Sequence, residues 1–170
     1  MTPKKRLTSI TIRAMVETDL AEVEALDRLC FSDPWPSGSF AYELKPGSTN
    51  ICLVAIDNLS EHILKLIGVI IVWIIVDEAH IGTIAVHPDY RHNGVGRRLL
   101  SEALLIAADR GAVSSLLEVR AGNHDALALY YGLGYEAVGL RAGYYADNHE
   151  DALLLTWQKI DKEKLATLIR

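Results

Sequence analysis

HPDYRHNGVGRRLL, residues 87–100, connects an apolar, β-branched run to a run with helical periodicity. The preceding residues 80–86, HIGTIAV, have the composition of a strand, and from Gly94 onward apolar residues recur on one helix face. The connection therefore contains the amino terminus of a helix, whose first backbone N–H groups lack partners within the helix and bind anions. This position predicts either a plain turn or a site for a negatively charged ligand.

The glycines and arginines of this stretch favour an anion site over a plain turn. Gly94 and Gly96 let a ligand approach the backbone, and the surrounding cationic side chains suit a phosphate or pyrophosphate. These side chains are Arg91, Arg97 and Arg98. The stretch is no P-loop, because no Gly-Lys-Ser/Thr follows, and no dinucleotide fingerprint, because Leu99 occupies the place of the third glycine.

Composition narrows the class of protein. The 170 residues fit one domain, 1–170, with a core of about 10–157 and a tail of 158–170; half of them are hydrophobic and 23% are charged. The net charge of −5 disfavours nucleic acid as a partner. The longest apolar run, 63–76, contains Lys65 and is shorter than the roughly 20 residues that span a bilayer, so we expect no membrane partner.

The number and spacing of the cysteines and histidines argue against a disulfide scaffold and against a metal site. Cys30 and Cys52 are too few and too far apart for a disulfide scaffold, and the amino terminus lacks the apolar core of a signal peptide. We expect two reduced thiols in a cytoplasmic protein. The six histidines show no metal-ligand spacing, so no metal is expected.

Periodicity predicts the order β-α-α-β-β-β-α-β-α-β-β. The first helix should bury Leu20, Val23, Leu26 and Leu29 after a cap at Thr18 or Asp19. The expected strands are 9–15, 50–57, 63–76, 78–87, 113–120, 135–145 and 150–157, with a polar turn at 58–62. The strand at 113–120 follows a helix and should run parallel to its predecessor. This order predicts an α/β fold with a single mixed, mostly antiparallel sheet flanked by helices.

The stretch IAVHPDYRHNGVGRRLL, residues 84–100, resembles the acetyl-CoA motif of the GCN5-related N-acetyltransferase (GNAT) superfamily. Arg91, Gly94 and Gly96 fill its pattern Arg/Gln-x-x-Gly-x-Gly/Ala, and the following segment LLEVRAGNHDALALYYGLGY is also similar to the family. The resemblance implies a GNAT fold with acetyl-CoA in the splay between the fourth and fifth strands. The cofactor-binding residues that it implies are Ile84, Ala85, Val86, Arg91, His92, Asn93, Gly94, Val95, Gly96, Arg97, Asn123 and Tyr130.

The family resemblance implies catalytic roles for Glu118 and Tyr130. An α-amino group has an ordinary pKa of about 7.7 to 8.0, so it must lose a proton before it attacks a thioester. Glu118 would accept that proton, directly or through water, and Tyr130 would protonate the leaving thiolate. The alternatives without a catalytic role are that Glu118 is a solvated glutamate at a strand end and that Tyr130 packs in the core. Asn123 could simply cap a helix.

The substrate side resembles the branch of the family that acetylates the N-terminal alanine of a small-subunit ribosomal protein. FSDPWPSGSF, residues 31–40, and the Tyr-Tyr hairpin at 141–155 carry this likeness, with an altered spacing at Pro36. The likeness implies Trp35, Tyr144 and Tyr145 as substrate-binding residues and a protein N-terminus as partner. The alternatives are a GNAT enzyme for a small-molecule amine or a lysine side chain, and a non-catalytic acyl-CoA-binding module.

Overall fold

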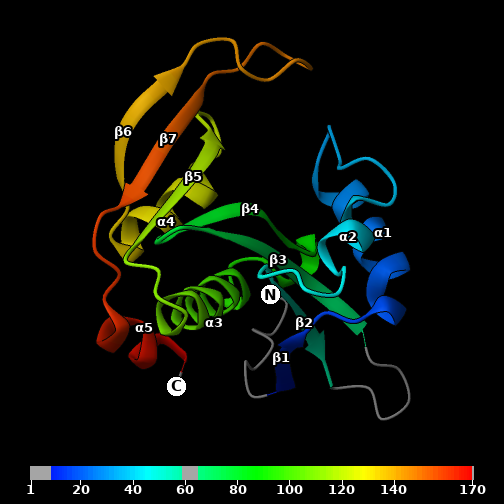
Figure 1. Ribbon diagram of the computed structural model, residues 1–170. Coiled ribbons are helices and arrows are strands. Elements are labelled where there is room, and N and C mark those ends of the chain that lie inside the picture. The colour runs from blue at the N-terminus through cyan, green and yellow to red at the C-terminus, as the bar shows by residue number, and fades with distance from the viewer. Residues whose placement is uncertain (1–8, 59–64, 170) are drawn as a thin grey trace.

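A seven-stranded sheet lies at the centre of the molecule, with helices on both of its faces (Figure 1). The computed structural model describes residues 9–58 and 65–169. The strands are β1 (Ile10–Ala14), β2 (Ile51–Asp57), β3 (Lys65–Ile75), β4 (Glu78–Val86), β5 (Ser114–Arg120), β6 (Glu136–Arg141) and β7 (Ala152–Trp157). The helices are α1 (Leu20–Cys30), α2 (Ser39–Glu43), α3 (Val95–Asp109), α4 (His124–Leu133) and α5 (Lys162–Ile169). The predicted element order is confirmed, and the predicted turn at 58–62 lies largely outside the described residues.

The sheet order is β1-β2-β3-β4-β5-β7-β6. Every neighbouring pair is antiparallel except β4 and β5, which run parallel as predicted. β7 lies between β5 and β6, so the last hairpin joins the sheet through its second strand. This arrangement leaves β6 at an edge, where most of its residues are exposed.

The two faces of the sheet carry separate hydrophobic cores. Every residue of β2 is buried, and its consecutive residues Leu53 and Val54 belong to different core clusters. α3 packs on the face that contains Leu53, whereas α1 and α2 cover the face that contains Val54. A strand with helices on both sides has no polar face, which explains the uninterrupted apolar runs in the sequence.

The first helix differs from the prediction in its buried face and in its cap. Leu29 is 55% exposed, whereas Asp27 is 1% exposed. Leu29 lies roughly 120° around the helix from the buried Val23 at about 3.6 residues per turn, so it misses the buried face that Asp27 occupies. Asp19 stands at the amino-terminal cap position, but its carboxylate accepts hydrogen bonds from Val16 N and Arg13 rather than from the helix.

β4 and β5 separate after a short contact, and this separation positions the site. Their pairing covers Glu78–His80 against Ser114–Leu116. Beyond that point β4 stays paired with β3, and β5 stays paired with β7. The facing edges of the two strands therefore part in the middle of the sheet.

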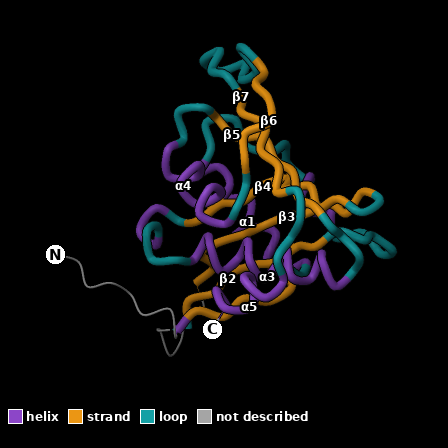
Figure 2. Tube along the Cα trace, turned by 90° about the vertical axis from the view of Figure 1, so that its left-hand side faces the viewer, coloured by secondary structure: helices purple, strands orange, loops and turns teal. Residues whose placement is uncertain are grey.

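α5 lies beside α3 at the carboxyl end of the chain, as the two views in Figures 1 and 2 agree. Its Leu165 is completely buried, so this segment contributes to the core on the α3 face. None of the helices in the described part of the chain is long and apolar enough to cross a membrane.

Candidate active site

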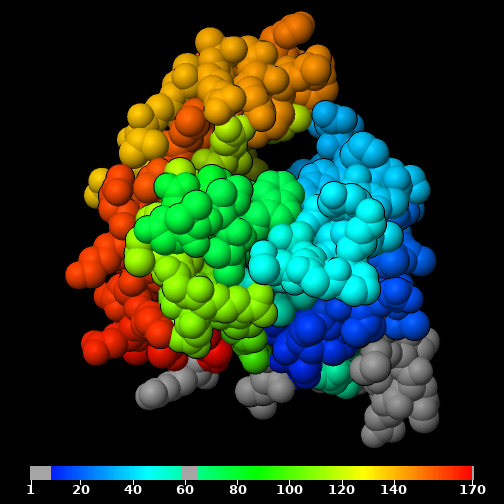
Figure 3. Space-filling view, viewed as in Figure 1, coloured from blue at the N-terminus to red at the C-terminus, as the bar shows by residue number. Residues whose placement is uncertain are grey.

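A cavity of about 1030 Å³ opens where β4 and β5 separate. Its walls come from the loop after α1, from residues 81–86 of β4, from the turn before α3, from residues 117–120 of β5 and from α4. Figure 3 shows this side of the molecule hollowed between the β6–β7 hairpin at the top and the loop after α1 on the right. All the predicted cofactor-binding residues except Asn93 thus line one cavity.

The β4 wall presents a backbone edge to a ligand. The parallel pairing with β5 ends at His80, so residues 81–86 have no β5 partner in the ladder. Unpaired N–H and C=O groups inside a cavity favour a ligand that pairs with them as an added strand would. Ile84, Ala85 and Val86, predicted from the resemblance, all line this wall.

The turn before α3 has the form of an anion site. His92 and Gly94 adopt the left-handed conformation, with φ angles of 58° and 82°. Gly94 is the amino-terminal cap of α3, and because it has no side chain to bond the first-turn N–H groups, those donors stay available. Gly94, Val95 and Gly96 line the cavity, so the positive end of the α3 dipole lies in the cavity wall.

Some side chains of this turn line the cavity, and others form hydrogen bonds within the protein. Arg91, His92 and Arg97 line the cavity. Asn93 donates its side-chain amide to the Arg91 carbonyl at 2.9 Å and is not among the lining residues, so it stabilises the turn. Arg98, which the sequence assigned to the anion site, bonds instead to Glu102 and to the Ile10 carbonyl, both at 2.9 Å.

Glu118 lies on the β5 wall of the cavity, and its side chain is 31% exposed. Its Oε1 lies 3.2 Å from Nη2 of Arg141, and the hydrogen bond from Tyr144 to Glu118 raises the pKa of that tyrosine. The carboxylate is therefore both accessible from the cavity and held by two neighbours. This arrangement suits a group that exchanges a proton with a ligand.

Tyr130 reaches the cavity from α4 and is 5% exposed. Its ring contacts the edge of Tyr135 with the ring centres 5.6 Å apart. Burial raises the pKa of the Tyr130 phenol above its ordinary range, so the hydroxyl carries its proton at neutral pH. Asn123 lines the same cavity, and the predicted cap is confirmed because its Oδ1 accepts a hydrogen bond from Ala126 N at 3.2 Å.

The loop after α1 contributes an aromatic wall. Trp35 lines the cavity and stacks on Phe40 and Trp73 at centroid distances of 4.9 and 6.0 Å. Asp27 Oδ2 accepts a hydrogen bond from Trp35 N at 2.7 Å, while its Oδ1 has no partner in the described part of the chain. Burial raises the pKa of Asp27, a residue that the sequence reasoning missed because it expected an apolar side chain on that face.

The β6–β7 loop meets the loop after α1 above the cavity. Arg120 donates to both carboxylate oxygens of Asp147 at 2.9 and 3.0 Å, and its guanidinium lies 3.8 Å from the ring centre of Tyr145. Asp147 also accepts a hydrogen bond from Ser32 Oγ at 2.6 Å. Tyr145 lines the cavity, whereas Tyr144 contacts it through Glu118. These contacts join segments 115 residues apart in sequence, so sequence reasoning could not detect them.

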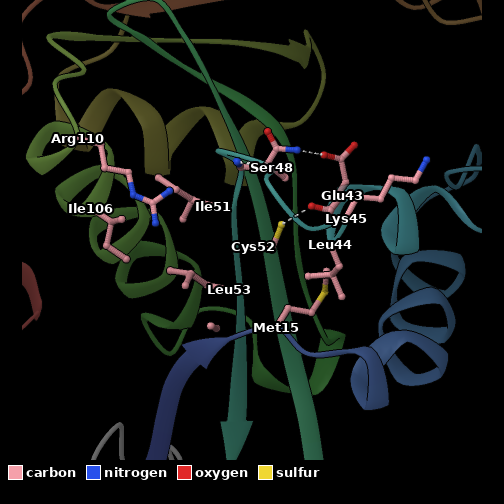
Figure 4. Close-up of a pocket in the computed structure, with 12 residues that line it drawn as sticks. Met15, Glu43, Leu44, Lys45, Ser48, Ile51, Cys52, Leu53, Ile106 and Arg110 are labelled. Carbon is pink, nitrogen blue, oxygen red and sulfur yellow. Dashed lines mark hydrogen bonds between the residues drawn. The ribbon is translucent and has the colours of Figure 1, made fainter.

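A second cavity of about 270 Å³ lies at the other end of α3 (Figure 4). Ile106 and Arg110 form its α3 side. The Glu43 carboxylate in its wall already accepts hydrogen bonds from Asn50 and Trp73, and Arg110 donates to the Thr49 carbonyl. These groups are engaged within the protein, so the larger cavity is the candidate active site.

No metal site accompanies these residues. Across 9–58 and 65–169, no three His, Cys, Asp or Glu side chains come close enough together to hold a metal ion.

Comparisons with known proteins agree with this geometry. The model of the acetyltransferase (GNAT) family matches residues 20–135. The [ribosomal protein bS18]-alanine N-acetyltransferase of Salmonella typhimurium is 33% identical over 147 residues, which are 85% of this chain and 95% of that protein. The crystal structure of the ribosomal-protein-S18-alanine N-acetyltransferase from Escherichia coli is 30% identical, with a TM-score of 0.78 over 89% of this chain and 95% of that one.

A structure with a bound acetyl donor shares the same fold. Arabidopsis thaliana NAA60 in complex with acetyl-CoA superposes with a TM-score of 0.78 over 88% of this chain and 99% of that one, at 22% identity. The likeness extends over nearly the whole of both chains.

Proposed function

The chain belongs to the acetyltransferase (GNAT) family and is an N-acetyltransferase that uses acetyl-CoA, and we propose that it acetylates the N-terminal amine of a protein. The acceptor that we propose is the N-terminal alanine of ribosomal protein bS18, on which the Salmonella relative acts. The observation that carries the proposal is the single cavity that contains the α3 amino terminus, Glu118 and Tyr130. A ribosomal substrate would give the protein a cytoplasmic location.

The residues of the cavity fit acetyl-CoA, which supplies an activated acetyl group as a thioester. The first-turn N–H groups of α3, from Val95 to Arg97, would hold the pyrophosphate, with Arg91 adding charge. The cavity edge of β4 at Ile84–Val86 would pair with the pantetheine arm through its remaining groups, since the Val86 carbonyl already accepts hydrogen bonds from Arg91 Nε at 3.1 Å and Cys30 Sγ at 3.4 Å. Asn123 would hydrogen-bond to the same arm. Gly94 has a φ angle of 82°, in the left-handed region that glycine adopts freely and other residues rarely adopt. The turn that would hold the pyrophosphate therefore depends on glycine at this position.

Glu118 would accept the proton of the incoming amine. An α-ammonium group has an ordinary pKa of about 7.7 to 8.0, so most of the substrate arrives protonated at neutral pH. The Glu118 carboxylate lies 3.2 Å from Arg141 and is accessible from the cavity, so it can bind the ammonium and take its proton. The free amine then has the lone pair that attack on the carbonyl requires.

Tyr130 would return a proton to the leaving sulfur. Tyr130 lines the cavity, and a phenol of ordinary pKa about 10 carries a proton at neutral pH; burial raises this pKa further, so the transfer requires the thiolate to form beside the hydroxyl. The nitrogen loses its second proton after the attack, and this proton replaces the one that Tyr130 gives to the sulfur, while the first proton passes from Glu118 to solvent.

The acceptor would lie between the loop after α1 and the β6–β7 loop. Trp35 and Tyr145 line that part of the cavity, and Tyr144 bonds to Glu118. The hydrogen bond between Ser32 and Asp147 closes this part from above, so we expect an extended chain end to enter along the groove. A lysine side chain or a small-molecule amine would meet the same walls, and the acceptor must be identified by experiment.

Mass spectrometry of intact ribosomal proteins identifies the acceptor directly. In cells lacking this gene, we expect bS18 to lose the mass of one acetyl group while other ribosomal proteins keep theirs. Complementation with the wild-type gene should restore the acetyl group, and the matched Glu118→Gln gene should not. A bS18 that stays acetylated in the deleted strain would contradict the proposed acceptor.

A further inference from the structure

The carboxylate of Glu118 already has a cationic partner within the protein. Nη2 of Arg141 lies 3.2 Å from Glu118 Oε1. Arg141 is the last residue of β6, and β7 separates this strand from β5. Neighbouring strands lie about 4.8 Å apart, so a side chain must extend across roughly 10 Å of sheet to make this contact. An arginine has the length to do so.

The substrate amine requires the same carboxylate oxygens. A protonated N-terminus is a compact cation with three N–H donors, and the Arg141 guanidinium is also a cation, with Nη2 3.2 Å from Glu118 Oε1. Two cations beside one carboxylate repel each other. Binding of the ammonium group is therefore in competition with Arg141.

Arg141 is the cation that can leave. Its side chain is 55% exposed, and exposed ion pairs of this kind contribute little to stability. Arg120, on the same strand as Glu118, is instead held by Asp147 and Glu150 and is 23% exposed. A guanidinium released from Glu118 can remain over the Tyr144 ring, whose centre lies 5.6 Å away, or extend into solvent.

We infer that Arg141 is an internal counter-ion that occupies the amine subsite of Glu118 until a cationic N-terminus displaces it. This inference rests on the proposed function, in which Glu118 receives the substrate amine. Acetylation converts the ammonium into a neutral amide, which no longer competes for the carboxylate. Arg141 then returns to Glu118, so the same contact weakens binding of the charged substrate and favours release of the neutral product.

Steady-state kinetics on the full-length protein test this role. The substrate is an alanine-initial peptide at saturating acetyl-CoA, and the inhibitor is the same peptide already acetylated at its N-terminus. Arg141→Gln removes the competing charge, so the KM of the free peptide should fall about twofold to fivefold, the range that an exposed ion pair allows. Arg141→Lys keeps the charge and should keep the wild-type KM. The inhibition constant of the acetylated peptide should be the same in all three proteins.

Two results would overturn the inference. One is an Arg141→Gln protein whose KM for the free peptide is unchanged or higher. The other is an equal change for the free and the acetylated peptide, since this would indicate a structural effect on the groove. If the wild-type protein acetylates no N-terminal peptide, both the proposed function and this inference are wrong. If the wild type is active and Arg141→Gln has the same KM for the free peptide, only the role of Arg141 is refuted.

Discussion

Substitutions at Gly96, the second residue of α3, can test the effect of charge at the anion site apart from the effect of side-chain size. A Cβ at this position would lie 3.6 Å from both Leu129 Cδ2 and Val86 Cγ2, which is ordinary van der Waals contact. Gly96 also has an ordinary helical backbone, so alanine should raise the free energy of unfolding by about 0.5–1 kcal/mol. Gly96→Ala is therefore a folded control for Gly96→Glu, which adds a carboxylate to the turn.

The effect of the added carboxylate follows from the proposed position of the pyrophosphate. Two unit charges about 6 Å apart interact with ~3 kcal/mol at an effective dielectric constant of about 20. The side chains of the turn are partly exposed, and salt screens them, so we take about half of this value for each of two phosphate charges. The sum of ~3 kcal/mol corresponds to acetyl-CoA binding that is about a hundredfold weaker.

Isothermal titration calorimetry with acetyl-CoA measures this effect. We expect Gly96→Ala to bind within about tenfold of the wild type, a factor that corresponds to about 1.4 kcal/mol, and Gly96→Glu to bind far more weakly. Thermal unfolding of both variants checks that the fold is intact. Equal affinities of the alanine and glutamate variants would refute the assignment of the turn as the pyrophosphate site.

Three further predictions concern the core and the catalytic groups. Tyr135 and Ser115 share a buried hydrogen bond of 2.6 Å, so Tyr135→Phe should lower the free energy of unfolding by about 1–2 kcal/mol in denaturant titration; no change would refute the role of this bond. Arg13 holds the pKa of Asp19 below its usual range, so the pair stabilises the fold above the ordinary carboxyl pKa, and this contribution disappears as the pH falls through the lowered value. Asp19→Asn should therefore be less stable than the wild type by about 1 kcal/mol at neutral pH and equally stable in acid, and a constant difference would contradict this linkage. Tyr130→Phe should keep the packing on Tyr135 and lower kcat by about tenfold or more, whereas an unchanged kcat would exclude Tyr130 as the acid.

Local features of the fold were predictable because short stretches encode them. Helical and strand periods locate the elements, and Gly94 marks the start of α3 as expected. Asn123 caps α4 as its position indicated. Arg98 was assigned wrongly to the anion site, although Glu102 four residues later offers the usual helix ion pair, and this spacing could have corrected the prediction.

Contacts that depend on the sheet order were not predictable. Arg141 reaches Glu118 across β7, which lies between β5 and β6, and nothing local in the sequence specifies this order. The composition offers a partial signal, since ALLLTW in β7 is more apolar than EAVGLR in β6 and belongs inside the sheet. The contact of Ser32 with Asp147 joins two loops and has no pattern that sequence periodicity could detect.

The central claim is that the cavity between β4 and β5 acetylates a protein N-terminus with Glu118 as the base. The most direct measurement incubates the purified protein with acetyl-CoA and an alanine-initial peptide that also contains a lysine, and locates the acetyl group by tandem mass spectrometry. We predict that the wild type acetylates the α-amine and leaves the lysine free, and that Glu118→Gln lowers kcat by about a hundredfold or more. Acetylation of the lysine alone, or full activity in Glu118→Gln, would contradict the account.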